Sequence, residues 1–231
     1  MRTLHALTIV MSAQQLSIAC QAAGSTTARK ALIRKHIKDV LQVLPDEDIV
    51  EKSSAILNRL CGMQEYRDSK CICLYLSMPA GEVQSYKILQ DAFDNGKRVF
   101  IPKVAGKNSQ DLKIFELSSF SMISEFPKSK WGIPEPTKEF TDIAVDATYL
   151  GLVDCVILPG VAFDSSCGRV GHGKGYYGEK RNLRKSKTNH FDTQLLIFVH
   201  YGIFRLIFRE GICGQSSGWK ISTRHNRDCF R

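Results

Sequence analysis

The segment between Asp164 and Tyr177 has the residue types and spacing of a phosphate-binding loop. Arg169 and Lys174 supply positive charge there, among several glycines. Glycines allow successive backbone N–H groups to turn toward a common point, and the two cations complement phosphate charge. The segment is therefore predicted to hold a polyphosphate, although a flexible surface loop rich in glycine stays open as the alternative. The glycines are Gly168, Gly171, Gly173 and Gly175.

The same segment departs from a true P-loop at one position. The run Gly168-x-x-x-x-Gly173-Lys174 satisfies the spacing, but Gly175 stands where a Ser or Thr would bind Mg²⁺. A Walker-type loop is therefore not predicted. Tyr176 and Tyr177 follow, and their faces and hydroxyls could stack a heteroaromatic ring. Adjacent tyrosines are more often one core residue and one exposed residue, so both interpretations stay open.

Apolar periodicity predicts the elements that position these residues. Helical spacing predicts a basic amphipathic helix over 28–44, a second helix over 45–62 and a third over 83–93. Apolar runs predict strands over 71–76, 98–101, 112–115 and 153–158, with a proline-stiffened connection over 131–136. Strand, helix and strand in succession form a βαβ unit. The predicted class is α/β, with ligand loops at the strand ends.

Glu82 is a second candidate for ligand binding. It follows the predicted strand over 71–76 and a Pro-Ala-Gly turn. An acid at this place can bind a ligand, or it can simply be the first-turn acid of the next helix. The sequence leaves both roles open.

Composition places the chain among ordinary globular proteins. With 231 residues, 43 % hydrophobic and 24 % charged, it suits one large domain or two small ones. The net charge of +9 is concentrated in residues 179–231, where 11 Lys and Arg face 4 Asp and Glu; before them the numbers are 21 and 19. This asymmetry marks a basic tail rather than a nucleic-acid-binding domain.

Cysteine spacing and hydropathy exclude further classes. The eight cysteines lack paired CxxC spacing and are interpreted as reduced thiols without zinc. The longest apolar stretch, 195–208, is too short to cross a bilayer and contains His200 and Arg205. The first 38 residues contain no acid, which is compatible with a mitochondrial presequence or with an unstructured leader over 1–27.

Five segments together resemble the 5-formyltetrahydrofolate cyclo-ligase family, also called methenyltetrahydrofolate synthetases. Each segment is weak alone, but their order and spacing are specific, and the resemblance covers about residues 28–177. The segments are Lys30–Arg34, Leu76–Glu82, Trp131–Pro136, Leu158–Asp164 and Gly168–Tyr177.

The resemblance implies a Rossmann-like open, mostly parallel sheet flanked by helices. It implies cyclisation of 5-formyltetrahydrofolate to 5,10-methenyltetrahydrofolate, with ATP and Mg²⁺ as cofactors and with ADP and phosphate released. The expected substrate carries a polyglutamate chain or none, and the expected protein is a cytoplasmic or mitochondrial monomer without membrane or nucleic-acid partners.

The resemblance also implies residue roles, one position at a time. Lys174, Arg169 and Tyr177 would act in the reaction. The nucleotide would contact Lys30, Arg34, Arg169, Gly171, Gly173, Lys174, Gly175 and Tyr176. The folate would contact Leu76, Met78, Glu82, Trp131, Tyr176 and Tyr177.

The chain departs from the family pattern after Tyr177. The family places a Mg²⁺-binding acid there, followed later by apolar strands, whereas this chain has Gly178 and a basic run. Residues 178–231 are therefore expected to be an atypical tail with nothing resembling the family's closing strand, produced by an altered reading frame, a retained intron or a mis-joined gene model. Lineage divergence is the alternative.

This departure affects the expected activity. Little turnover is expected, no metal ligand is assigned, and Gly178→Asp alone is not expected to restore activity, because an uncovered sheet edge would remain. The alternative function is a non-catalytic, basic-tailed protein on the same fold that binds nucleotide or nucleic acid.

Overall fold

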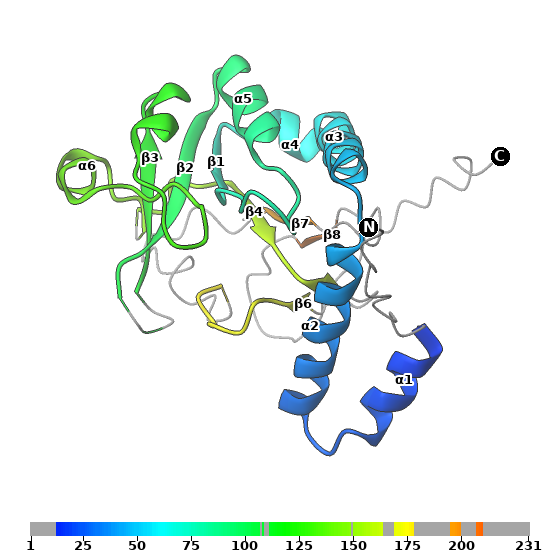
Figure 1. Ribbon diagram of the computed structural model, residues 1–231. Helices are drawn as coiled ribbons and strands as arrows, with labels where there is room; N and C mark the ends of the chain where they lie inside the picture. The colour runs from blue at the N-terminus through cyan, green and yellow to red at the C-terminus, as the bar shows by residue number, and fades with distance from the viewer. Residues whose placement is uncertain are drawn as a thin grey trace, which may run out of the picture.

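The chain forms a six-stranded sheet with the order β3-β2-β1-β4-β7-β8 (Figure 1). The computed structural model describes residues 13–106, 108, 111–148, 150–163, 169–177, 195–199 and 207–209. β1 (Cys71–Leu74), β2 (Arg98–Val104), β4 (Cys155–Pro159) and β7 (Leu195–Val199) run parallel. β3 (Leu112–Leu117) and β8 (Ile207–Arg209) are antiparallel edge strands. The predicted α/β class with a mostly parallel sheet is confirmed.

Helices and a small ladder surround this sheet. α3 (Asp46–Gly62), α4 (Gln64–Asp68) and α5 (Tyr86–Asp94) lie together near one face, and α6 (Lys138–Ile143) lies beside β3 (Figure 1). α1 (Ala13–Ala22) and α2 (Thr26–Gln42) form a hairpin that projects from the body. A 3₁₀ helix spans Ser121–Glu125, and β5 (Ala162–Phe163) pairs with β6 (Arg169–Val170).

The central strands bury side chains on both faces of the sheet. Ile72 and Leu74 of β1 pack into a large cluster with α3 and α5, and Cys73 between them packs into a second cluster on the other face. All five residues of β4 are buried. Continuous apolar runs without polar alternation are typical of parallel strands covered on both sides, which is why the sequence located β1 and β4 well.

The third predicted helix begins three residues later than expected. Apolar periodicity starts at Val83, but α5 begins at Tyr86. Ser77 and Ser85 each accept a hydrogen bond from the other's backbone N–H, at 3.2 and 3.0 Å, and Ser53 Oγ accepts one from Gln84 N–H at 3.0 Å. These side chains hold the backbone before Tyr86 in a loop, because hydroxyl groups compete for donors that a helix would use.

Contrary to the expectation that nothing after Tyr177 resembles a closing strand, two strands are present there. β7 pairs in parallel with β4 from Cys155–Leu195 to Pro159–Val199, and β8 pairs with β7. Residues 195–199 are Leu-Leu-Ile-Phe-Val, a β-prone apolar run suited to a strand beside β4. Averaging the composition over 178–231 hides this run among basic residues. The other residues of that range, Gly178 among them, lie outside the described part of the chain.

The leader expected over 1–27 contains regular structure. α1 occupies ten of those residues, and α2 starts at Thr26 after Ser25, whose side chain accepts a hydrogen bond from Ala28 N–H at 3.2 Å. A serine at this position is a common N-cap, and it fixes where α2 begins. Within the described residues, no helix is long and apolar enough to span a membrane. Targeting by the acid-free first 38 residues, of which 1–12 lie outside the described part, stays a prediction.

The described cysteines are free thiols. Cys73 and Cys155 are buried in β1 and β4, and burial raises the pKa of each to about 12. Both are therefore protonated at neutral pH and act as small apolar residues. Over the part of the chain that the structure describes, no group of three His, Cys, Asp or Glu side chains is arranged to hold a metal.

Candidate functional site

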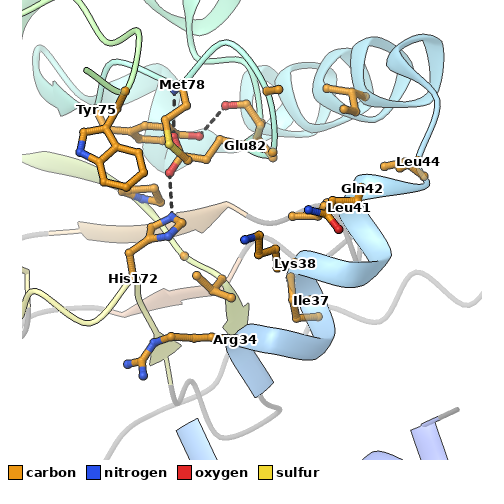
Figure 2. Close-up of a pocket in the computed structure, with 18 of the residues that line it drawn as sticks. Arg34, Ile37, Lys38, Leu41, Gln42, Leu44, Tyr75, Met78, Glu82 and His172 are labelled. Atoms are coloured by element: carbon orange, nitrogen blue, oxygen red, sulfur yellow. Dashed lines mark hydrogen bonds and ion pairs between the residues drawn. The ribbon is translucent and has the colours of Figure 1, made fainter. Parts of the chain in front are cut away.

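A cavity of about 560 Å³ opens where the carboxyl ends of β1 and β4 meet (Figure 2). One face of α2 and the start of α3 form one wall, and the loops after β1 and β4 form the other. Trp131 and His172 also line it. Loops at the carboxyl ends of parallel strands are the usual ligand sites of open α/β sheets.

Glu82 faces this cavity from a loop that its own neighbours hold in place. Its Oε2 atom accepts a hydrogen bond from Met78 N–H at 3.1 Å, and its Oε1 atom lies 3.3 Å from His172 Nε2. The Gln84 side chain donates to the carbonyls of Met78 and Glu82, at 3.1 and 2.9 Å. Only 11 % of the Glu82 side chain is exposed. A buried carboxylate with spare lone pairs can accept N–H donors from a ligand.

The glycine segment is attached to the rest of the site through two arginines. Arg34 of α2 donates from Nε to the carbonyl of Gly171 at 2.8 Å, and Arg169 donates from Nε to the carbonyl of Pro159 at 2.8 Å. The backbone at Gly173 has φ +103°, a conformation that favours glycine. A Cβ at Gly171 would lie 3.1 Å from Arg169 Nη1. The backbone here therefore approaches two guanidinium groups closely.

Arg169 is prepared to meet an anion. Burial lowers its pKa, and the nearby Tyr177 and Glu82 partly oppose that effect. Its guanidinium lies 5.4 Å from the centre of the Tyr177 ring. Among the described residues, no carboxylate lies within ion-pair distance of it. Arginine stays charged in proteins, so desolvation without a paired anion is costly, and a bound phosphate would relieve that cost.

Tyr176 and Tyr177 have different surroundings. Tyr177 packs against the smaller core cluster, and burial raises its pKa. Tyr176 is half-buried, and its hydroxyl donates to the carbonyl of Gly106 at 3.4 Å. The structure therefore gives Tyr177 a packing role beside Arg169 and leaves Tyr176 nearer the surface.

Comparison with known proteins assigns this arrangement to a family. The family model described as the 5-formyltetrahydrofolate cyclo-ligase family matches residues 26–201. The chain belongs to this family. The match continues past Tyr177 and includes β7, so the resemblance does not end where the sequence patterns suggested.

Individual members of the cyclo-ligase family agree. The chain is 38 % identical over 152 residues to a probable 5-formyltetrahydrofolate cyclo-ligase of Schizosaccharomyces pombe, covering 64 % of this chain and 70 % of that one. It is 30 % identical over 196 residues to the mouse 5-formyltetrahydrofolate cyclo-ligase, covering 84 % and 89 %. The NMR structure of Aquifex aeolicus 5,10-methenyltetrahydrofolate synthetase shares the fold, with a TM-score of 0.56, 21 % identity and coverage of 85 % and 99 %.

The structure brings most of the expected site residues to one place. Arg34, Met78, Glu82 and Trp131 line the cavity. The glycine segment from Arg169 to Tyr177 borders it through His172. Lys174 and Gly175 are exposed, as is Lys30, one helical turn before Arg34 on α2. Leu76 is buried in the larger core, outside the cavity lining, and Gly168 lies outside the described residues. The roles themselves stay predictions.

Several cavity residues were missed by sequence reasoning. His172 was passed over because it stands between glycines, although it is the side chain that meets Glu82. Ile37, Lys38 and Leu41 continue from Arg34 along one face of α2. Their spacing of three, four and seven residues after Arg34 is the signal that could have found them.

The Trp131–Pro136 connection closes one side of the cavity because a glycine packs against the loop after β1. Trp131 is 62 % exposed at the rim. Gly132 has φ +74°, and a Cβ there would lie 2.7 Å from Pro79 Cγ. Lys103 Nζ donates to the carbonyl of Pro136 at 2.6 Å. Only a residue without a side chain allows this close approach of the two segments.

Gly132→Ala is therefore expected to lower the free energy of unfolding by about 2–3 kcal/mol, through backbone strain together with the contact at Pro79. Gly81→Ala is the matched control, because Gly81 has φ +77° but nothing within 4 Å of a Cβ. It should cost about 1–2 kcal/mol, from strain alone. Urea unfolding of both variants measures the difference. Equal losses would mean that the contact with Pro79 does not constrain the connection.

The described residues fit a polyphosphate better than they fit its metal. The glycine segment offers close backbone approach and the half-buried Arg169, which pairs with no described carboxylate, and both features suit phosphate. Mg²⁺ bound with phosphates needs one or two carboxylates. The acids among the described cavity residues are Asp46 and Glu82, and neither belongs to the glycine segment that would hold the phosphates. No described residue is therefore assigned to Mg²⁺.

Proposed function

We propose that the chain is an ATP- and Mg²⁺-dependent 5-formyltetrahydrofolate cyclo-ligase. The cavity between α2 and the loop after β1 would hold the folate, and the glycine segment would hold the triphosphate. We call the cavity and the glycine segment the two half-sites. The observation that carries this proposal is the contact between them, from His172 of the glycine segment to Glu82 of the cavity, within a chain of the cyclo-ligase family.

The cavity has the size and chemistry for a pterin. A volume of about 560 Å³ is within the usual range of small-molecule sites. Ile37, Leu41 and Met78 give apolar walls, and Trp131 offers an aromatic face at the rim. The Glu82 carboxylate would accept hydrogen bonds from pterin N–H groups. An apolar slot with one well-placed acid both binds and orients such a ring.

The chemistry needs positioning more than proton transfer. ATP would transfer its γ-phosphoryl group to the formyl oxygen, with release of ADP, and would thereby convert that oxygen into a leaving group. N10 would then attack the formyl carbon, with loss of the N10 proton and departure of phosphate. The chain's contribution is to hold the formyl oxygen near the glycine segment and to surround the transferring charge with Arg34, Arg169 and Lys174. Preorganised cations and N–H groups in a partly dry site are the main source of rate enhancement in phosphoryl transfer.

Gly178 makes reduced turnover the expected result for the chain as it stands. By resemblance, an acid that helps bind Mg²⁺ belongs directly after Tyr177, and Gly178 has no side-chain oxygen. The earlier reason for expecting Gly178→Asp to fail was an uncovered sheet edge, but β7 pairs along β4. The single substitution is therefore expected to raise turnover about tenfold or more.

Formation of methenyltetrahydrofolate, followed by its absorbance with 5-formyltetrahydrofolate, ATP and Mg²⁺, tests this expectation. Gly178→Ala is the matched control and should behave like the wild type, because it adds a side chain without an oxygen. Robust wild-type turnover that Gly178→Asp does not increase would contradict the account. Such a result would place the role on a tail acid such as Glu179 or Asp192.

Three further expectations stay predictions. They are a monomeric state, the length of any polyglutamate chain on the substrate, and residence in the cytoplasm or the mitochondrion.

A further inference from the structure

His172 and Glu82 form a direct side-chain contact between the glycine segment, Arg169–Tyr177, and the loop after β1. His172 Nε2 lies 3.3 Å from Glu82 Oε1, and Figure 2 shows the imidazole directed at the carboxylate across the cavity. The His172 side chain is 55 % exposed, whereas that of Glu82 is 11 % exposed. An exposed side chain of the glycine segment thus meets a largely buried acid of the loop after β1.

Glu82 is held in place because hydrogen bonds fix the loop around it. Glu82 Oε2 accepts from Met78 N–H, and the Gln84 side chain holds the carbonyls of Met78 and Glu82. The glycine segment is held at its two ends, by the pairing of β6 with β5 and by the hydrogen bond from the Tyr176 hydroxyl to the carbonyl of Gly106. Its residues from His172 to Gly175 are exposed, and before them Arg34 holds the carbonyl of Gly171. The bond to Glu82 is therefore the next restraint along an otherwise exposed run of backbone.

We propose that His172 is a positioning residue that couples folate binding to nucleotide binding, by fastening the glycine segment to Glu82. This inference rests on the proposed function of the two half-sites. A carboxylate has about four lone-pair sites, so Glu82 can accept N–H donors from a pterin while it keeps Met78 and His172. A folate that immobilises Glu82 then also immobilises the far end of the His172 contact.

The consequence is a positive coupling between the ligands. Ordering the glycine segment costs conformational entropy. If the first ligand already orders part of the segment, the second ligand loses less entropy when it binds. Linkage requires the effect to be reciprocal, so nucleotide should strengthen folate binding by the same factor. Removal of the imidazole should abolish the coupling while leaving the Glu82 loop intact.

Calorimetric titration with adenylyl imidodiphosphate and Mg²⁺, in the absence and presence of saturating 5-formyltetrahydrofolate, tests the coupling without turnover. For the wild type, folate should strengthen nucleotide binding about fivefold or more. For His172→Ala the factor should fall to about one. His172→Gln should restore part of it, because its amide can donate from a position near that of Nε2.

Lys35→Ala is the matched control. It breaks the Lys35–Asp39 ion pair of 2.8 Å on α2, and neither residue lines the cavity. It should keep the wild-type coupling. A second readout needs no ligand: the His172 ¹⁵N imidazole signal should shift on Glu82→Gln.

The possible results distinguish a failure of the His172 role from a failure of the proposed function on which it rests. Both ligands binding to the wild type without coupling, or unchanged coupling in His172→Ala, would overturn the role of His172 alone. A wild type that binds neither ligand would overturn the proposed function and the inference with it.

Discussion

Lys174→Ala is expected to weaken ATP binding roughly 10- to 150-fold, equivalent to about 1.5–3 kcal/mol. Lys174 is exposed between Gly173 and Gly175, and within the described part of the chain no carboxylate pairs with it. Its ammonium group is therefore available for a phosphate oxygen. A charge-assisted contact of this kind in a partly dry site is worth more than an exposed ion pair.

Titration of the variant with ATP and with 5-formyltetrahydrofolate checks this expectation, and folate affinity should change far less. Lys70→Ala is the matched control, because Lys70 is an exposed lysine just before β1, at the opposite end of the strand from the site. It should leave both affinities unchanged. Equal weakening of both ligands by Lys174→Ala, or no weakening, would contradict a phosphate role.

Glu82→Gln is expected to weaken 5-formyltetrahydrofolate binding roughly 10-fold or more, with at most a few-fold change for ATP. The amide keeps one oxygen that can accept from Met78 N–H, but it loses the charge and the second acceptor oxygen. The loop should survive the change, because Gln84 and the Ser77–Ser85 pair also hold it. The loss should therefore fall on the ligand.

The same two titrations measure this effect, with urea unfolding to confirm that the variant is folded. Glu65→Gln serves as the control, since Glu65 is an exposed acid on α4 outside the cavity lining. An unchanged folate affinity in Glu82→Gln would assign Glu82 the simpler role of organising the turn after β1.

The sequence predicted the central elements because their signals are local. β1 and β4 appear as continuous apolar runs, and α3 starts directly after Pro45 with three acids in its first turn. The late start of α5 was not predictable, since it depends on Ser53 and Ser77 meeting residues distant in the chain. β7 was missed for a related reason. Its five apolar residues become a recognisable strand only when β4 is known to need a neighbour.

The site residues divide in the same way, into those with a local sequence signal and those that depend on contacts between distant segments. Motif resemblance found Arg34, Glu82 and Arg169, since each belongs to a segment with a specific pattern. His172 is found only through its contact with Glu82 across the cavity, which no local pattern records. Leu76 shows the converse case. It belongs to a segment that resembles the family, yet its side chain is part of the core. Position within a motif does not decide which way a side chain points.

Hydrogen–deuterium exchange of the full chain, with each ligand added separately, tests the central claim most directly because it requires no turnover. The account predicts that 5-formyltetrahydrofolate slows exchange of backbone amides in 78–83. It predicts that ATP with Mg²⁺ slows exchange in 171–177. Protection by both ligands confined to segments away from the cavity and the glycine segment would contradict it, as would exchange that neither ligand alters.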